Sequence, residues 1–237
     1  MFLSKSQSEQ TAVASSLPAY RRVQHRLLGL CILLAPLTVT VYLMTWITIR
    51  GSSFSYSQSL IYSQSVAALG NSVNDTHMVF GILATIFLPL GYFGMAVLGM
   101  KHAPWLATIS SIFALVGWAP FGAIISLDIM VYAVARGGDI PQLVTFWGQF
   151  NANPFIMAFQ YIYILGHMVS AILLGILLGR ARLIPAWAAW AFALSSPVTM
   201  CLFAFHLFPQ FVWIVCILLI IGAFPAALAM WRSKGDV

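Results

Sequence analysis

Charged side chains are scarce in this sequence. Asp, Glu, Lys and Arg make up only 7% of its 237 residues, whereas soluble domains carry about 25%. Five acidic and eleven basic residues cannot surround a globular protein of this size with a polar shell, and 61% of the chain is hydrophobic. This scarcity excludes an ordinary soluble domain and indicates a multi-pass membrane protein.

Cysteine is scarce as well, and its positions exclude two common uses. Cys31, Cys201 and Cys216 each lie in an apolar run, and no CxxC spacing occurs. A disulfide framework or a zinc site needs paired or clustered cysteines. We therefore interpret the three as small apolar side chains.

Long apolar runs are abundant, and six of them reach the roughly 20 residues that a spanning helix needs. They cover about 27–48, 77–99, 106–135, 156–179, 185–206 and 210–231. The sequence predicts an all-α membrane protein, a six-transmembrane-helix bundle over residues 25–232. We expect residues 1–24 to be a disordered cytoplasmic tail, residues 233–237 to be a second tail, and Pro141 to begin a short interfacial helix.

The basic residues predict the orientation of the bundle. With a cytoplasmic N-terminus, only Arg50 and Arg136 lie outside, and the other nine lie inside: Lys5, Arg21, Arg22, Arg26, Lys101, Arg180, Arg182, Arg232 and Lys234. Such a bias is typical of cytoplasmic loops. The net charge of +6 therefore favours the lipid bilayer as partner, and we expect no nucleic acid.

Small residues and prolines interrupt several spans. Gly166, Gly175 and Gly179 predict a close helix contact, because residues this small let backbones approach. Prolines inside the apolar runs indicate either kinks that help helices pack or broken helices that line a transport site; they are Pro36, Pro89, Pro120, Pro197 and Pro225.

Two ionisable residues stand within apolar runs, Asp128 in "ISLDIMVYA" and His167 in "YILGHMVSA". At a rise of 1.5 Å per residue, His167 lies roughly 20 Å above the cytoplasmic end of its helix, and Asp128 roughly 10 Å below the outer end of its own. In a core of about 30 Å these depths match. We therefore expect the two side chains to pair, as a structural hydrogen bond or as a proton-handling or ligand site; the remaining alternative is that they make no contact.

Further polar residues gather near the outer ends of the spans. His77 begins the second span, Gln160 lies in the fourth, and His206 ends the fifth. Together with Asp128 and His167 they predict an outward-facing polar pocket. The alternative is that helix ends near water are polar without forming a site.

The residue types leave several chemistries open, none with a strong motif. His77 and His206 resemble a possible axial pair for haem. His77, Asp128, His167 and His206 include the ligand types of an intramembrane zinc hydrolase, but no HxxxH or HExxH occurs. Ser126 and Ser170 lack a GxSxG context. We assign no catalytic residue, no metal and no cofactor.

Two joins between spans resemble a known family. Residues 165–198, "LGHMVSAILLGILLGRARLIPAWAAWAFALSSPV", and residues 99–117, "GMKHAPWLATISSIFALVG", resemble the joins of an uncharacterised bacterial six-helix integral membrane protein family, a domain of unknown function. The resemblance implies a multi-pass protein of the bacterial cytoplasmic membrane and transfers no catalytic residue.

The predicted function is a non-catalytic binding, sensing or transport-like module whose ligand is a small molecule or a lipid, with the oligomeric state left open. The alternative is an intramembrane metal-dependent hydrolase or haem/redox protein that uses the outer His and Asp residues.

Overall fold

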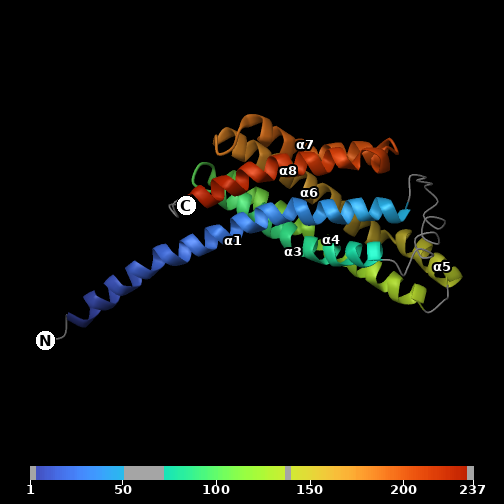
Figure 1. Cartoon of the computed structure of the whole chain (residues 1–237), viewed down its shortest axis with the longest axis horizontal. Helices are drawn as coiled ribbons and strands as arrows, with labels where there is room; N and C mark the ends of the chain where they lie inside the picture. Colours follow the sequence, from blue (N-terminus) through green and yellow to red (C-terminus); the bar gives the residue numbers. More distant parts are fainter. Residues whose placement is uncertain (1–3, 51–71, 137–139, 234–237) are drawn as a thin grey trace.

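A computed structural model describes residues 4–50, 72–136 and 140–233. Over these residues the chain is helical, with short turns between helices (Figure 1). The helices are α1 (Ser4–Arg50), α3 (Ser72–Gly99), α4 (Pro104–Arg136), α5 (Ile140–Asn151), α6 (Pro154–Arg180), α7 (Ala186–Ala204) and α8 (Phe208–Arg232).

Six of the described helices are long and apolar enough to cross a membrane. The candidate spans are Val23–Thr48, Val73–Gly99, Pro104–Met130, Pro154–Arg180, Ala186–Ala204 and Gln210–Arg232. Large apolar side chains remain exposed on their outer faces, as at Ile86, Leu165 and Ile217. The predicted all-α, six-helix membrane bundle is confirmed.

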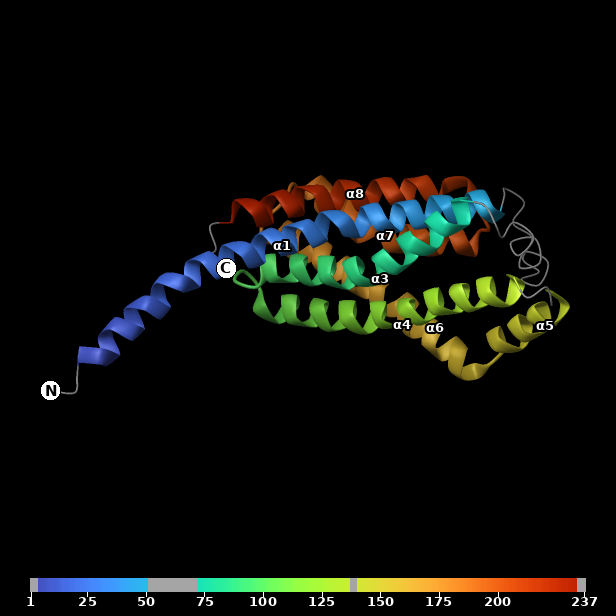
Figure 2. The ribbon, with the colours of Figure 1, turned by 60° about the horizontal axis from the view of Figure 1, so that its bottom comes forward.

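The six spanning helices form a closed ring. Each packs on the spanning helix before it and the one after it, and α8 returns to α1. The second span, α3, also contacts α6 and α8 across the ring, so it is the most central helix (Figure 2). The core therefore runs along the whole bundle, with Leu88, Tyr92 and Phe192 among its fully buried side chains.

The first helix is longer than the sequence analysis predicted. It begins at Ser4 and has 47 residues, or about 70 Å, and its N-terminal part extends beyond the bundle (Figure 1). The tail expected over residues 1–24 is thus helical from Ser4 onward. Its Ala, Gln, Glu and Lys residues have high helix propensity, which an argument from polarity alone overlooks.

The short helix predicted after Pro141 is confirmed as α5, at the end of the bundle opposite the two termini (Figure 1). After it, the chain turns into α6 through a regular N-terminal cap. The Phe155 N–H donates to Asn153 Oδ1 at 2.9 Å, and Pro154 occupies the first turn. Both features are typical of helix starts.

The turns that follow α6 and α7 close in the same way. After α6, the Leu183 N–H donates to Leu178 O and the Arg182 N–H to Gly179 O. This is the Schellman pattern, which needs a left-handed residue after the helix. Arg182 supplies it with φ 52°, and His206 does so after α7 with φ 59°.

Five helices carry a proline of an apolar run in their interior, at Pro36, Pro89, Pro120, Pro197 and Pro225. Each helix continues through its proline without a break. The structure therefore favours the packing interpretation of these prolines over broken helices that line a transport site.

Glycines set the closest helix contacts, as the sequence predicted. A Cβ added at Gly117 on α4 would lie 2.3 Å from the backbone N of His167 and 2.4 Å from the carbonyl carbon of Gly166 on α6. A Cβ at Gly175 would lie 2.7 Å from Ala189 O on α7. Real Cβ atoms do not approach this closely, so α6 contacts α4 and α7 backbone to backbone.

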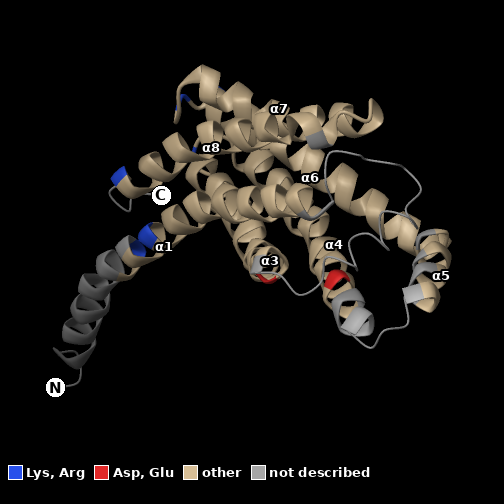
Figure 3. Ribbon diagram, turned by 45° about the vertical axis from the view of Figure 1, so that its right-hand side comes forward, with Lys and Arg blue, Asp and Glu red and all other residues tan. Residues whose placement is uncertain are grey.

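Charge divides the described bundle into two ends. Lys101, Arg180, Arg182 and Arg232 lie at the end near the C-terminus, here called the basic end (Figure 3). Asp75 lies in the first turn of α3 and Asp128 toward the end of α4, at the opposite end, here called the acidic end, where Figure 3 shows its red segments. The fold thus separates charges of opposite sign along the helix axes.

Candidate functional site

Asp128 contacts two side chains from two other helices. The Tyr42 hydroxyl on α1 donates to Asp128 Oδ2 at 3.4 Å. His77 Nε2 on α3 lies 3.9 Å from the same oxygen. The side chains of His77 and Asp128 are 5% and 16% exposed, so the carboxylate receives most of its surroundings from protein.

Hydrogen bonds fix the ring of His77. Its Nδ1 lies 3.0 Å from the backbone oxygen of Tyr42 and 3.2 Å from Thr45 Oγ1. A carbonyl oxygen only accepts, so Nδ1 carries a hydrogen and donates. The Thr45 hydroxyl already donates to Val41 O at 2.7 Å, which leaves its lone pairs for His77. Nε2 therefore faces Asp128.

Ring packing holds the same three helices together. The Tyr42 and His77 rings stack with centroids 4.3 Å apart, and Phe121 on α4 meets the Tyr42 ring edge-on at 5.6 Å. Gly81 makes room for this stack, because a Cβ there would lie 3.2 Å from ring carbons of Tyr42. Tyr42, Thr45, His77 and Asp128 are called the Tyr42–His77–Asp128 cluster below.

The predicted pair of Asp128 and His167 does not form. Within the described residues no hydrogen bond or ion pair joins them, and Asp128 contacts Tyr42 and His77 instead. The depth argument failed because α4 has 33 residues and is about 50 Å long. Its end at Arg136 therefore lies beyond a membrane core of about 30 Å. From Pro104, Asp128 is about 36 Å along the helix, whereas His167 is about 20 Å from Arg180.

His167 lies deeper in the bundle, at the level of Gly117. Its Nδ1 donates to Tyr163 O one turn earlier on α6. Its ring packs on Tyr163 and Trp118, with centroids 4.6 Å and 5.1 Å away. Trp118 is 6% exposed, and within the described residues its Nε1 has no hydrogen-bond partner. This second centre is mostly aromatic and holds no carboxylate among the described residues.

The remaining residues of the predicted pocket are spread over the acidic half. Gln160 is half-buried on α6, and His206 is exposed in the turn between α7 and α8. His206 occupies the left-handed position that closes α7, a position in which His is enriched among non-glycine residues. Of the five predicted residues, His77 and Asp128 lie in contact with each other.

The geometry gives no support to the metal and haem alternatives. Within the described residues, no three His, Cys, Asp or Glu side chains gather to hold a metal ion. Both nitrogens of His77 face protein partners, which leaves no direction for an axial bond to haem. Ser126 and Ser170 donate to the backbone oxygens of Gly122 and His167, as ordinary helix-packing serines do.

Sequence reasoning missed Tyr42 and Thr45. Both lie toward the acidic end of the first span, and hydroxyl groups were not counted among the ionisable residues. The helix lengths could have identified the pair. Measured along the helices from the basic end, His77 on α3 and Asp128 on α4 lie at nearly equal distances, and the two helices are consecutive and antiparallel. That comparison pairs them, and their shared depth then points to Tyr42 on α1.

Comparison of the chain with protein-family models, with curated proteins and with solved structures finds no match.

Proposed function

We propose that the protein is a non-catalytic, multi-pass protein of the bacterial cytoplasmic membrane, with both termini in the cytoplasm, that binds a proton from the outer side at the Tyr42–His77–Asp128 cluster. Under this proposal it acts as a sensing or transport-like module. The resemblance to bacterial six-helix proteins supports the compartment, and the basic residues support the orientation.

The observation that carries this proposal is the approach of His77 Nε2 to Asp128 Oδ2 at 3.9 Å. Because Nδ1 already donates to Tyr42 O, a neutral His77 would turn the lone pair of Nε2 toward a carboxylate oxygen. Two lone pairs repel, so the contact is favourable when Nε2 carries a hydrogen and donates it to the Asp128 carboxylate. An ionisable pair within spanning helices is a functional-site hypothesis by default.

The position of the cluster supports access from the outer side. Asp128 lies about 36 Å along α4 from Pro104, farther than the roughly 30 Å of a membrane core, and His77 lies five residues after the start of α3. Because its partners come from α1, α3 and α4, gaining or losing a proton changes the contact between these three helices. This is the kind of local charge change that biases a larger movement.

The test is nuclear magnetic resonance of ¹⁵N-histidine-labelled protein in lipid nanodiscs at neutral pH. His77→Gln identifies the His77 signals. We expect the wild-type Nε2 resonance to report a hydrogen shared with Asp128. Asp128→Asn should change it to that of a plain acceptor, because an asparagine amide donates its own hydrogen.

Ser126→Ala is the matched control on the same helix, since Ser126 is exposed and donates only to Gly122 O among the described residues. It should leave the His77 resonance unchanged. A wild-type Nε2 resonance identical to that of Asp128→Asn would refute proton binding by the pair.

A further inference from the structure

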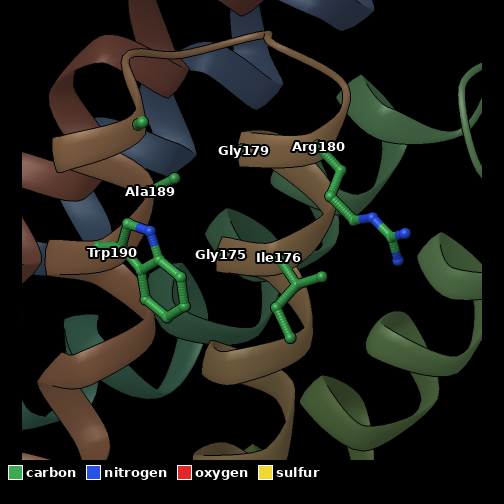
Figure 4. Close-up of a pocket in the computed structure, with 7 residues that line it drawn as sticks. Gly175, Ile176, Gly179, Arg180, Ala189 and Trp190 are labelled. Atoms are coloured by element: carbon green, nitrogen blue, oxygen red, sulfur yellow. The ribbon is translucent and has the colours of Figure 1, made fainter.

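A second feature, at the basic end, is a groove between α6 and α7 with a volume of about 360 Å³. Its lining comes from the last turns of α6 and the first turns of α7: Gly175, Ile176, Gly179, Arg180, Ala186, Ala189 and Trp190 (Figure 4). Apart from Arg180, these side chains are apolar or absent. The groove therefore suits a hydrocarbon chain.

The groove exists because small residues face each other across the helix pair. Gly175 on α6 lies directly against Ala189 and Ala193 on α7, so the two helices are in close contact at this point. Gly179 and Ala186 leave the adjoining surface hollow, while Ile176 and Trp190 stand at its sides (Figure 4). Trp190 is 62% exposed, so it faces the surroundings of the bundle rather than its core.

Arg180 belongs to the lining of this apolar groove, and its side chain extends to the side of α6 away from Trp190 (Figure 4). The last carbonyl groups of α6 already accept from Ala181, Arg182 and Leu183, so the guanidinium is not needed to cap the helix. Arg180 is exposed, and no ion pair to it occurs among the described residues. Within the bundle, the acidic side chains that the structure describes are those of Asp75, in the first turn of α3, and Asp128, toward the end of α4, so both lie toward the opposite end.

We propose that this groove binds an anionic phospholipid, with one acyl chain along Gly175, Gly179 and Ala186 and the phosphate at Arg180. Arginine matches phosphate through its planar fork of N–H donors, and basic pockets between spanning helices bind anionic headgroups. A second copy of this chain fits less well, because a symmetric contact would bring two Arg180 side chains together without a described acidic partner.

The test is native mass spectrometry of the purified full chain with added phosphatidylglycerol or phosphatidylcholine. We expect one phosphatidylglycerol to bind in clear preference to phosphatidylcholine. Arg180→Gln should weaken phosphatidylglycerol binding about fivefold, which corresponds to about 1 kcal/mol for one basic residue near the surface. Ala186→Leu should also weaken phosphatidylglycerol binding, because the larger side chain fills the groove. The fold should tolerate this change, because Ala186 is exposed and lies outside the core.

Two matched variants separate the groove from general effects. Arg232→Gln removes a cation from the same end, and Ala158→Leu adds the same bulk at an exposed position near the other end of α6. Both should bind phosphatidylglycerol like the wild type. Equal binding of the two lipids, or equal losses in Arg180→Gln and Arg232→Gln, would overturn the proposal. So would a dimer that Ala186→Leu disrupts while lipid binding persists.

Discussion

Tyr42 and His77 supply Asp128 with polar contacts that water would otherwise make. A charged side chain at the centre of a span costs about 2.5–3.5 kcal/mol on insertion scales, and less near the interface. Asp128 lowers this cost in two ways: it lies about 36 Å along α4 from Pro104, beyond a core of roughly 30 Å, and it has a hydroxyl and an imidazole within reach. The contacts and the position of Asp128 thus both lower the free-energy cost of placing a carboxylate in a spanning helix.

The first prediction concerns these contacts and uses double-mutant cycles. Tyr42→Phe and Asp128→Ala should be coupled by about 0.5–1.5 kcal/mol, because the first removes the donor and the second the acceptor of the same hydrogen bond. Asp128→Asn and His167→Gln should be additive within about 0.5 kcal/mol, because the residues lie at different depths and share no partner. Thermal unfolding in detergent measures both, and strong coupling of Asp128 to His167 would contradict the geometry described above.

The second prediction concerns Arg182, which has φ 52°. A left-handed backbone costs a residue with a side chain about 1–2 kcal/mol but costs glycine little. We expect Arg182→Gly to be more stable than Arg182→Ala by about 1 kcal/mol in detergent unfolding. Both variants lose the same exposed cation, so their difference isolates the backbone. Equal stabilities would mean that the turn relaxes in the alanine variant.

The sequence identified two of the residues in the cluster but paired Asp128 with the wrong partner. Residue type and an apolar context were sufficient to select Asp128 and His77 as members of a polar set. Pairing needed helix lengths, and an apolar run does not reveal that a helix continues beyond the membrane, as α4 does. The contact of Tyr42 with Asp128 could not be predicted either. It depends on the relative depths of three helices and on the stacking of Tyr42 on His77, and residue spacing in a single sequence specifies neither.

At the scale of helices, the contact of α4 with α6 depends on two glycines without side chains. Gly117 and Gly166 face each other, and this brings Trp118 against His167 and Tyr163. The prediction of a close contact from Gly166, Gly175 and Gly179 was correct. The sequence did not show that Gly166 faces α4 while Gly175 and Gly179 face α7, because that division depends on how the helices surround α6.

The third prediction tests this contact with two substitutions on one helix. Gly117→Ala places a Cβ against the α6 backbone and should destabilise the bundle by about 1–3 kcal/mol, as overpacking does. Gly122→Ala adds the same methyl where nothing lies within 4 Å, and should be neutral or slightly stabilising because alanine favours helices. Thermal unfolding of both variants decides the matter, and equal effects would show that α4 is not held close at Gly117.

At the scale of the whole molecule, the ring of six spans and the separation of charge describe a protein with two different ends. The number and approximate limits of the spans followed from composition and run length, because a bilayer demands long apolar helices. The closed ring did not follow from the sequence. Short connections make consecutive helices neighbours, but the return of α8 to α1 depends on contacts between distant segments, such as the bond from Trp231 Nε1 to Arg26 O at 3.2 Å.

The fourth prediction concerns the orientation of these ends. In a background without native cysteines, His102→Cys at the basic end and Thr145→Cys on α5 both place a thiol at an exposed position. A membrane-impermeant maleimide added to intact cells should label position 145 directly and position 102 only after permeabilisation. The opposite pattern would reverse the proposed orientation. The sequence predicts that residues 52–74 and 138–150 lie outside; of these, residues 52–71 and 138–139 are not among the described residues.

The order of helices in the chain has a consequence for how the protein is made. Both partners of Asp128 precede it in the sequence, Tyr42 by 86 residues. Chains are synthesised from the N-terminus, so α1 and α3 are available in the membrane before α4 leaves the ribosome. The span that carries the carboxylate therefore enters beside a hydroxyl and an imidazole already in place, and its insertion depends on the two spans before it. Separated from them, α4 would have to carry Asp128 into lipid alone.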